Sequence, residues 1–128
     1  MKVRAGQTKF TNEQRVALGV RSDIDPNWQL TIGDTYVVYA VTCLTDPGVY
    51  GKAVLYMIVD DFDRLLPVPS CFFEIVDASV SKFWVAEYSA ASFKLAPREF
   101  LDNRFLTEEI LDREDTALAA FAKIRADF

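Results

Sequence analysis

The chain has 128 residues, 51% of them hydrophobic and 26% charged, and these values predict a single globular domain with its own core. The net charge is −5 and the isoelectric point is about 4.7. We therefore expect no nucleic-acid partner, because phosphate-backbone binding draws its affinity from lysine and arginine. No run approaches the ~18 consecutive apolar residues of a membrane-spanning helix, so no membrane association is expected.

The N-terminus and the cysteines predict a cytoplasmic location. The first ten residues, "MKVRAGQTKF", lack the apolar core of a signal peptide. Cys43 and Cys71 both lie in apolar, strand-like runs, where a buried and unreactive thiol is expected. A reducing compartment would leave both thiols free, and a Cys43–Cys71 disulfide would form only if the protein were exported.

The first 29 residues carry mixed signals. "MKVR" is expected to begin a strand, and "RSDIDPNW" is expected to be a polar turn because Pro26 restricts the residue before it. "TNEQRVALGV" fits two alternatives. It is either a short helix capped by Thr11 or Asn12, or a strand through residues 16–20.

Residues 30–95 are rich in β-branched and aromatic side chains, which predicts strands. One strand is expected from Thr35 to about Leu44, after a turn at Gly33-Asp34. "KAVLYMIVDD" predicts the next strand and "SCFFEIVD" a third. Between them, "FDRLLPVP" is expected to be a loop or an edge segment, because proline donates no hydrogen bond to a central ladder. "SKFWVAEYS" and "ASFKLAP" predict a hairpin that turns at residues 89–91.

Residues 97–126 are expected to be mainly helical. The final helix is expected to begin at Asp112 or Asp115 and to carry an apolar stripe that includes Phe121. Strands followed by helix predict an α+β fold, with a small, curled antiparallel sheet and a C-terminal helix. We divide this single domain into a variable N-terminal segment, a strand region and a helical region: 1–29, 30–95 and 97–126.

The absence of histidine removes most nucleophile–base pairs and zinc sites from consideration. No glycine-rich phosphate-binding motif is present. Carboxylate chemistry remains, since "VDDFD" places Asp60, Asp61 and Asp63 at the end of a strand. These residues could bind a divalent cation, or they could form a solvated turn whose like charges discourage edge aggregation. We predict no catalytic residue, metal ligand or cofactor.

The strongest charge feature lies between Arg98 and Asp115, where seven acidic residues face three arginines. Apolar residues alternate with them. This segment could simply cover the sheet with its apolar side, or it could be an acidic surface with apolar anchors that binds a basic protein. The candidate partner-binding residues are Glu99, Asp102, Glu108, Glu109 and Asp112, together with Asp60, Asp61 and Asp63.

Several motifs in one order carry a family resemblance: "LTIGDTYVVYAV", "YMIVDD", "PVPSCFFEIVD" and "SKFWVAEY", followed by an acidic helical tail. Over roughly residues 30–125 the chain resembles a group of small bacterial immunity-type proteins, which are encoded beside polymorphic or contact-dependent toxins. The resemblance implies an SH3-like barrel or curled sheet with a helical tail. It also implies a non-catalytic protein that neutralises a cognate protein toxin.

Three functions are therefore weighed. The first is a toxin-neutralising immunity protein, for which a basic nuclease would suit the acidic surface. The second is a general SH3-like module that binds peptides along an exposed sheet edge. The third is an enzyme that uses carboxylates and a metal ion, which would depend on divalent-ion binding at Asp61.

Overall fold

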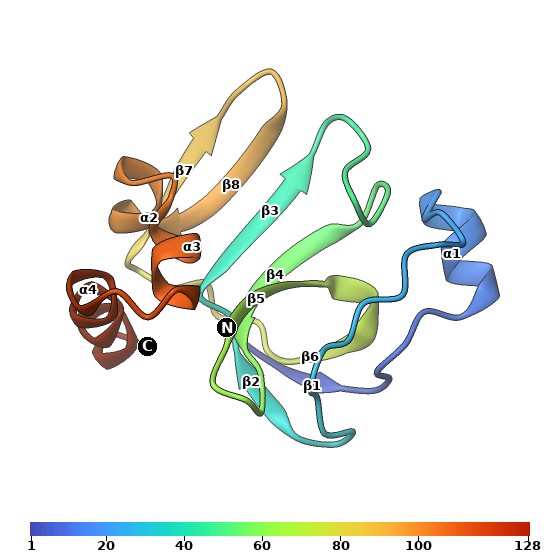
Figure 1. Cartoon of the computed structure of the whole chain (residues 1–128), viewed down its shortest axis with the longest axis horizontal. Coiled ribbons are helices and arrows are strands. Elements are labelled where there is room, and N and C mark those ends of the chain that lie inside the picture. The colour runs from blue at the N-terminus through green and yellow to red at the C-terminus, as the bar shows by residue number, and fades with distance from the viewer.

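The computed structural model describes residues 1–128 and contains two antiparallel sheets with helices at both ends of the molecule (Figure 1). The three-stranded sheet has the order β2 (Thr35–Val37), β1 (Lys2–Ala5) and β6 (Phe73–Asp77). The five-stranded sheet has the order β5 (Leu65–Pro69), β4 (Val54–Val59), β3 (Ala40–Leu44), β8 (Ser92–Pro97) and β7 (Trp84–Tyr88). The helices are α1 (Asn12–Leu18), the 3₁₀ turn η1 (Ser70–Phe72), α2 (Arg98–Asp102), α3 (Leu106–Leu111) and α4 (Asp115–Ala126).

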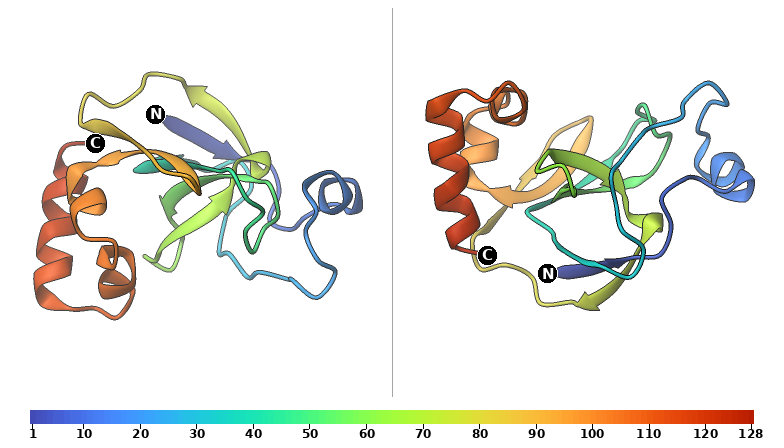
Figure 2. Two further views of the ribbon diagram at one scale, coloured as in Figure 1. Left: turned by 90° about the horizontal axis from the view of Figure 1, so that it is seen from above. Right: turned by 60° about the horizontal axis from the view of Figure 1, so that its bottom comes forward.

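This arrangement confirms the predicted α+β class, the antiparallel pairing and the C-terminal helix, but the strands form two sheets where one was predicted. The two sheets do not close on each other, since no strand of one is hydrogen-bonded in register to a strand of the other. The SH3-like barrel therefore stays a prediction. Figure 2 shows α4 at one end of the molecule and α1 at the opposite end. None of the helices is both long and apolar enough to span a membrane.

The five-stranded sheet separates two cores, which we call core one and core two. Along β4 the side chains alternate, so that Tyr56 and Ile58 enter core one while Met57 and Val59 pack against core two. Core one lies between the sheets and contains Val3, Ala5, Phe10, Val20, Trp28, Leu30, Tyr36, Val38, Tyr56, Ile58, Val68 and Phe72. Core two lies under the helical tail and contains Tyr39, Leu65, Leu106, Ile110, Ala117, Phe121 and Ile124.

The single strand predicted from Thr35 to Leu44 is wrong, because the chain changes sheets in the middle of it. The Val38 N–H donates to the Met1 carbonyl (3.1 Å), beside the first sheet, and the Tyr39 N–H donates to the Met57 carbonyl (2.8 Å), in the second. The two neighbouring side chains accordingly enter different cores. No glycine or proline marks this bend, so the local sequence reads as continuous strand.

The N-terminal segment is an integral part of core one. It supplies β1, as expected, together with the buried Phe10 and Trp28. Of the two alternatives for "TNEQRVALGV", the helix is correct, with Thr11 as its N-cap and a reciprocal capping box to Gln14. Gly19 ends the helix in the left-handed conformation.

The prolines of "RLLPVP" lie in β5, which is an edge strand, as the sequence predicted. The Asp60 N–H donates to the Arg64 carbonyl (2.9 Å), and this bond determines which pairs of β4 and β5 exchange hydrogen bonds. Pro67 and Pro69 face Met57 and Leu55 at the alternate, non-bonded positions. Their nitrogens therefore point away from β4, and this edge of the sheet offers no donor at either position.

Candidate functional site

The carboxylates predicted at the end of β4 lie on a tight turn between β4 and β5. The Asp63 N–H donates to the Asp60 carbonyl (3.0 Å), and Asp63 has a positive φ of 59°. This is the three-residue hairpin loop in which a left-handed residue follows a type I turn. Aspartate tolerates that conformation better than most side chains, so the residue type suits the turn.

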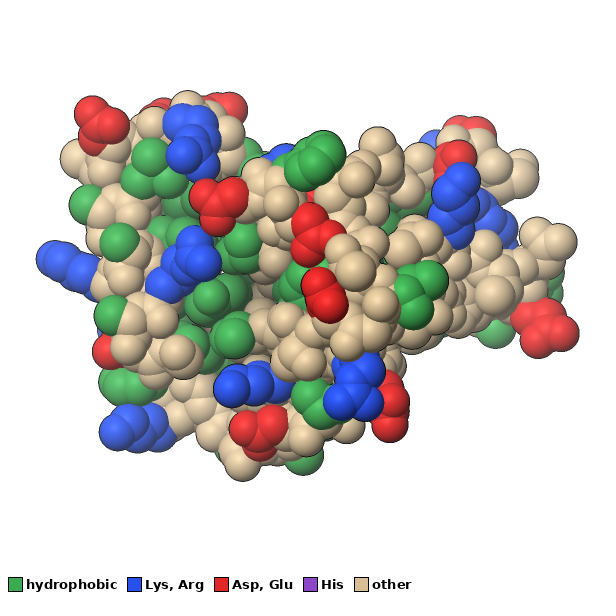
Figure 3. All heavy atoms as spheres, turned by 90° about the horizontal axis from the view of Figure 1, so that it is seen from below, with side chains coloured by type: hydrophobic (Ala, Val, Ile, Leu, Met, Phe, Trp, Pro, Cys, Tyr) green, Lys and Arg blue, Asp and Glu red, His purple; other side chains and the backbone are tan.

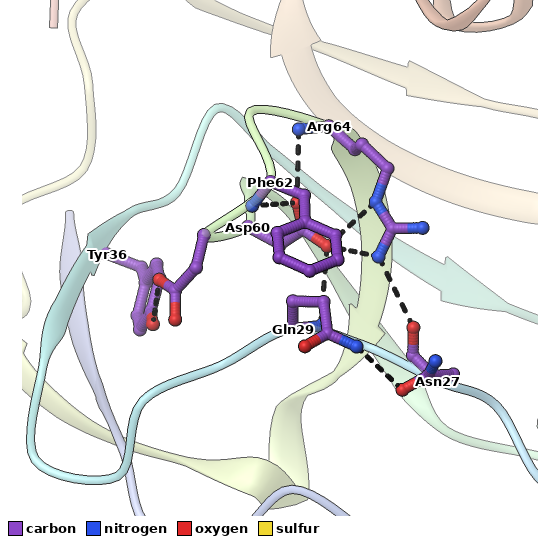
Figure 4. Close-up of polar contacts among 7 residues, drawn as sticks. Asn27, Gln29, Tyr36, Asp60, Phe62 and Arg64 are labelled. Atoms are coloured by element: carbon purple, nitrogen blue, oxygen red, sulfur yellow. Dashed lines mark hydrogen bonds and ion pairs between the residues drawn. The ribbon is translucent and has the colours of Figure 1, made fainter.

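Asp60 is buried and holds this turn together (Figure 4). Its Oδ1 accepts hydrogen bonds from the backbone N–H groups of Phe62 (3.0 Å) and Arg64 (3.1 Å). Its Oδ2 accepts from Arg64 Nε (3.0 Å), Arg64 Nη2 (2.6 Å) and the Gln29 N–H (3.3 Å). Burial opposes ionisation of Asp60, but the bonds from Arg64 and Gln29 outweigh burial and lower its pKa.

Asp61 is exposed and joins the turn to β2 and the loop before it. Its Oδ1 accepts from the Tyr36 hydroxyl (2.8 Å) and its Oδ2 from the Thr31 hydroxyl (2.6 Å). The Tyr36 oxygen in turn accepts from the Thr31 N–H (2.8 Å). Burial raises the pKa of Tyr36, and the hydrogen bond to Asp61 adds to that effect.

Asp63 joins the same turn to the helical tail. Its Oδ1 lies 3.2 Å from Arg125 Nη1, at the end of α4, and its Oδ2 lies 3.8 Å from Arg113 Nη1, between α3 and α4. All three side chains are exposed to solvent, so each ion pair is weak by itself. Together they connect two parts of the chain about sixty residues apart.

The three aspartates therefore do not form a metal site. Each binds a different set of partners, and no group of three or more Asp, Glu, Cys or His side chains is placed to hold a metal ion. Asp60 is also unavailable to a protein partner, because its side chain is fully buried. Of the three, Asp61 and Asp63 are on the surface.

Shallow hollows meet around Asp63. One of about 310 Å³ lies between this turn and α3, another of about 340 Å³ lies over β2 and the turn, and a third of about 240 Å³ lies against α4. On the face shown in Figure 3, hydrophobic side chains gather in a hollow bordered by charged side chains of both signs. These hollows are open to solvent, so they suit contact with a macromolecule better than enclosure of a small molecule.

The helical tail presents a mixed acidic and apolar face on α3. Leu106 and Ile110 enter core two, and the helical period turns Glu108 outward. Phe105 is 54% exposed and Leu111 is 39% exposed. We call the exposed side chains of Phe105, Glu108, Leu111 and Asp112 the α3 face.

The other predicted tail residues are either exposed or bonded within the tail. Glu99 and Asp102 are exposed on α2. Glu109 is half-buried, and its Oε2 accepts a hydrogen bond from Asn103 Nδ2 (2.9 Å). Glu109 is thus engaged within the tail, whereas Glu99, Asp102, Glu108 and Asp112 are free of any side-chain ion pair within 4.0 Å.

Comparison of the chain with protein-family models, with curated proteins and with solved structures finds no match. The resemblance to immunity-type proteins therefore has no support beyond the motifs that suggested it. Function is therefore inferred only from the side chains of the α3 face and of the turn around Asp63.

Sequence reasoning missed the basic partners of the carboxylates. The i,i+4 spacing of Asp60 and Arg64 was a usable signal, since a tight hairpin brings such residues together. Nothing local predicted that Arg113 and Arg125 would reach Asp63. Both cysteines are free, and they are half-buried where buried thiols were expected. Burial raises the pKa of Cys71, which makes that thiol less reactive.

Proposed function

We propose that this protein is a non-catalytic inhibitor that binds and neutralises a cognate protein toxin, in the manner of immunity proteins. The observation that supports it is the α3 face, where two exposed apolar side chains, Phe105 and Leu111, stand beside two exposed carboxylates, Glu108 and Asp112. Aromatic and aliphatic anchors surrounded by charge are typical of tight protein interfaces.

The chemistry of the α3 face favours a basic partner. Glu99 and Asp102, exposed on the preceding α2, add to the acidic charge of the tail, and the whole chain carries a charge of −5. One cation interrupts this charge, since Arg104 lies over the Phe105 ring, 4.8 Å from its centroid. Complementary charge accelerates encounter with a basic protein and disfavours acidic competitors. A nuclease toxin fits this description, because its own substrate demands a basic surface.

The scaffold beneath the α3 face is suited to rigid presentation. Leu106 and Ile110 anchor α3 in core two, and Asp63 connects the neighbouring turn to Arg113 and Arg125. A preordered surface loses little conformational entropy on binding. Neutralisation would follow from covering the toxin's active face, which requires no catalytic group on this chain.

The first test is co-purification of the tagged protein with the product of the neighbouring reading frame. We expect a stoichiometric complex, and we expect that neighbour to be toxic when it is expressed alone. One tight partner would favour the inhibitor over a general peptide-binding module, which would bind several peptides weakly. A protein that purifies alone beside a harmless neighbour would contradict the proposal.

The second test reverses charge on the α3 face. The double variant Glu108→Lys/Asp112→Lys should weaken the complex at least tenfold, chiefly through slower association that is sensitive to salt. The matched control is Glu13→Lys/Asp46→Lys, which makes the same change in net charge at two exposed carboxylates outside the helical tail that also have no ion pair. If both variants lose affinity equally, the α3 face is not the interface.

A further inference from the structure

The outer edge of β7 has unpaired backbone groups. In the β7–β8 hairpin the Ser89 N–H donates to the Ser92 carbonyl (2.9 Å), so the hydrogen-bonded pairs continue at Glu87–Lys94 and Val85–Ala96. The alternate residues, Trp84, Ala86 and Tyr88, direct their N–H and carbonyl groups away from β8. The Trp84 N–H is bonded to the Ser81 carbonyl (3.2 Å). The N–H groups of Ala86 and Tyr88 are free at the open edge.

The two edge strands of the five-stranded sheet, β5 and β7, differ in how well they are protected against pairing with a further strand. On β5, three residues at non-bonded positions face outward, and two of them, Pro67 and Pro69, have no N–H to donate. β7 reads "WVAEY" and has neither proline nor lysine, and its register with β8 contains no bulge. Figure 1 shows β7 at the margin of the sheet, in a hairpin that projects from the body of the molecule. Apart from its short length and the charge of Glu87, this edge has none of the features that commonly block strand addition.

The side chains along this edge extend the sheet's apolar surface. Tyr88 and Phe93 lie opposite each other in register and are 77% and 38% exposed. Ala86, also exposed, has a small side chain that leaves room for a neighbour beside it. On the other surface Glu87 is exposed, and its one charged neighbour in register is Lys94, on the side away from the open edge.

We propose that the β7 edge accepts an extended segment of a protein partner as an added strand. The segment would place apolar or aromatic residues beside Ala86 and Tyr88 and a lysine or arginine beside Glu87, because the carboxylate has no partner on that side. A second copy of this chain fits less well. Antiparallel self-pairing about Ala86 would put the two Glu87 side chains diagonally adjacent, between molecules that each carry a charge of −5.

This inference concerns a surface separate from the α3 face and holds whether or not the partner is a toxin. The probe is a capped seven-residue synthetic peptide of alternating lysine and valine, titrated onto the full chain. We expect saturable binding and slower hydrogen exchange at the Ala86 and Tyr88 amides. Binding by Glu87→Lys should be at least fivefold weaker than binding by the matched charge control Glu13→Lys.

The site itself is tested with Ala86→Pro, which removes the outward donor. The β8 ladder does not use this donor, so the hairpin should still form. We expect at least a tenfold loss of peptide affinity, while Ala86→Ser, which keeps the N–H, should stay within twofold of the natural chain. Unchanged exchange at the amides of Lys94 and Ala96 would confirm that the hairpin is intact.

Two outcomes would overturn the inference. One is peptide binding that Ala86→Pro leaves unaffected. The other is a dimer, detected by sedimentation, that Ala86→Pro abolishes, because the edge would then pair with a second copy. The effect of Ala86→Pro should persist in the Glu108→Lys/Asp112→Lys background, so failure at the α3 face and failure at the β7 edge can be told apart.

Discussion

Three aspartates of one turn have three different roles, although the sequence "VDDFD" makes them look equivalent. Asp60 is buried and neutralised by Arg64, Asp61 accepts two hydroxyl hydrogen bonds, and Asp63 pairs with arginines of the tail. Apart from the i,i+4 spacing of Asp60 and Arg64, only the tertiary structure distinguishes them, because the partners of Asp61 and Asp63 are distant in the chain. Residue type alone therefore predicted a cluster where the structure has three separate contacts.

Replacing Asp60 with asparagine should lower the free energy of unfolding by about 3 kcal/mol, because it leaves Arg64 without its ionic partner and weakens the bonds to the turn. Chemical denaturation measures this change. The matched control is Asp61→Asn, where the amide oxygen still accepts from Tyr36 or Thr31 and the loss should be about 1 kcal/mol. Equal losses in the two variants would mean that the buried Asp60–Arg64 pair stabilises the protein no more than the exposed contacts of Asp61.

The effect of Asp60→Asn on the free energy of unfolding should also depend on pH. Asp60 has a lowered pKa in the folded state, so its contribution is complete above the unfolded value of 3.8. That contribution is lost as pH falls below 3.8 and through the folded-state pKa. The free-energy difference between the natural chain and Asp60→Asn should therefore be constant above about pH 5 and shrink in acid. A difference that grows as pH falls would contradict the assignment.

At the scale of elements, α1 is attached to the sheet through its C-terminal end. None of its residues is buried, and the Lys52 N–H donates to the Leu18 carbonyl (2.8 Å). Beside that bond, Gly51 has a positive φ of 64°, and a Cβ there would lie 2.0 Å from the same carbonyl oxygen. Glycine is thus required at the joint between α1 and the loop before β4.

Gly51→Ala should consequently destabilise the protein at least twice as much as Gly33→Ala. Gly33 also has a positive φ, 92°, but nothing lies within 4 Å of its would-be Cβ, so only backbone strain of about 1–2 kcal/mol is added. Thermal unfolding of both variants compares them. Hydrogen exchange across residues 12–18 would show α1 loosening in Gly51→Ala alone, and similar exchange in both variants would refute this account of the joint.

Most elements could be predicted from the sequence because their signals are local. Alternation of apolar residues predicted β4, proline predicted an edge at β5, and Thr11 was one of two proposed caps for α1. The bend at Val38–Tyr39 could not be predicted, since it depends on which sheet each backbone group joins. The exposure of Glu108 was predictable from the amphipathic tail, whereas the open edge of β7 emerges only once the strand order is known.

At the scale of the whole molecule, the five-stranded sheet is shared by both cores. Residues of β4 alternate between them, and Tyr39 follows Val38 directly into the opposite core. Loss of either core would leave one face of the sheet exposed to water. The two halves are therefore expected to unfold together, as a single domain does.

Phe121→Ala tests this coupling. Phe121 is buried in core two against the ring of Tyr39, with centroids 5.3 Å apart, and its truncation should cost about 3–5 kcal/mol. In single-tryptophan chains, the transition reported by Trp28 in core one should shift as far as that reported by Trp84, which packs on the margin of core one with its ring 6.5 Å from that of Phe128 at the end of the tail. A shift at Trp84 alone would show that the helical tail unfolds independently.

The unequal edges of the five-stranded sheet also limit what it can assemble into. A strand added at β7 extends the sheet in one direction, while Pro67 and Pro69 leave the β5 side without donors at those positions. Repeated edge-to-edge growth of this sheet would require both edge strands, β5 and β7, to hydrogen-bond to a neighbouring strand. If a strand binds at β7 as proposed, this sheet would form a finite complex with one added strand and would not extend into a filament.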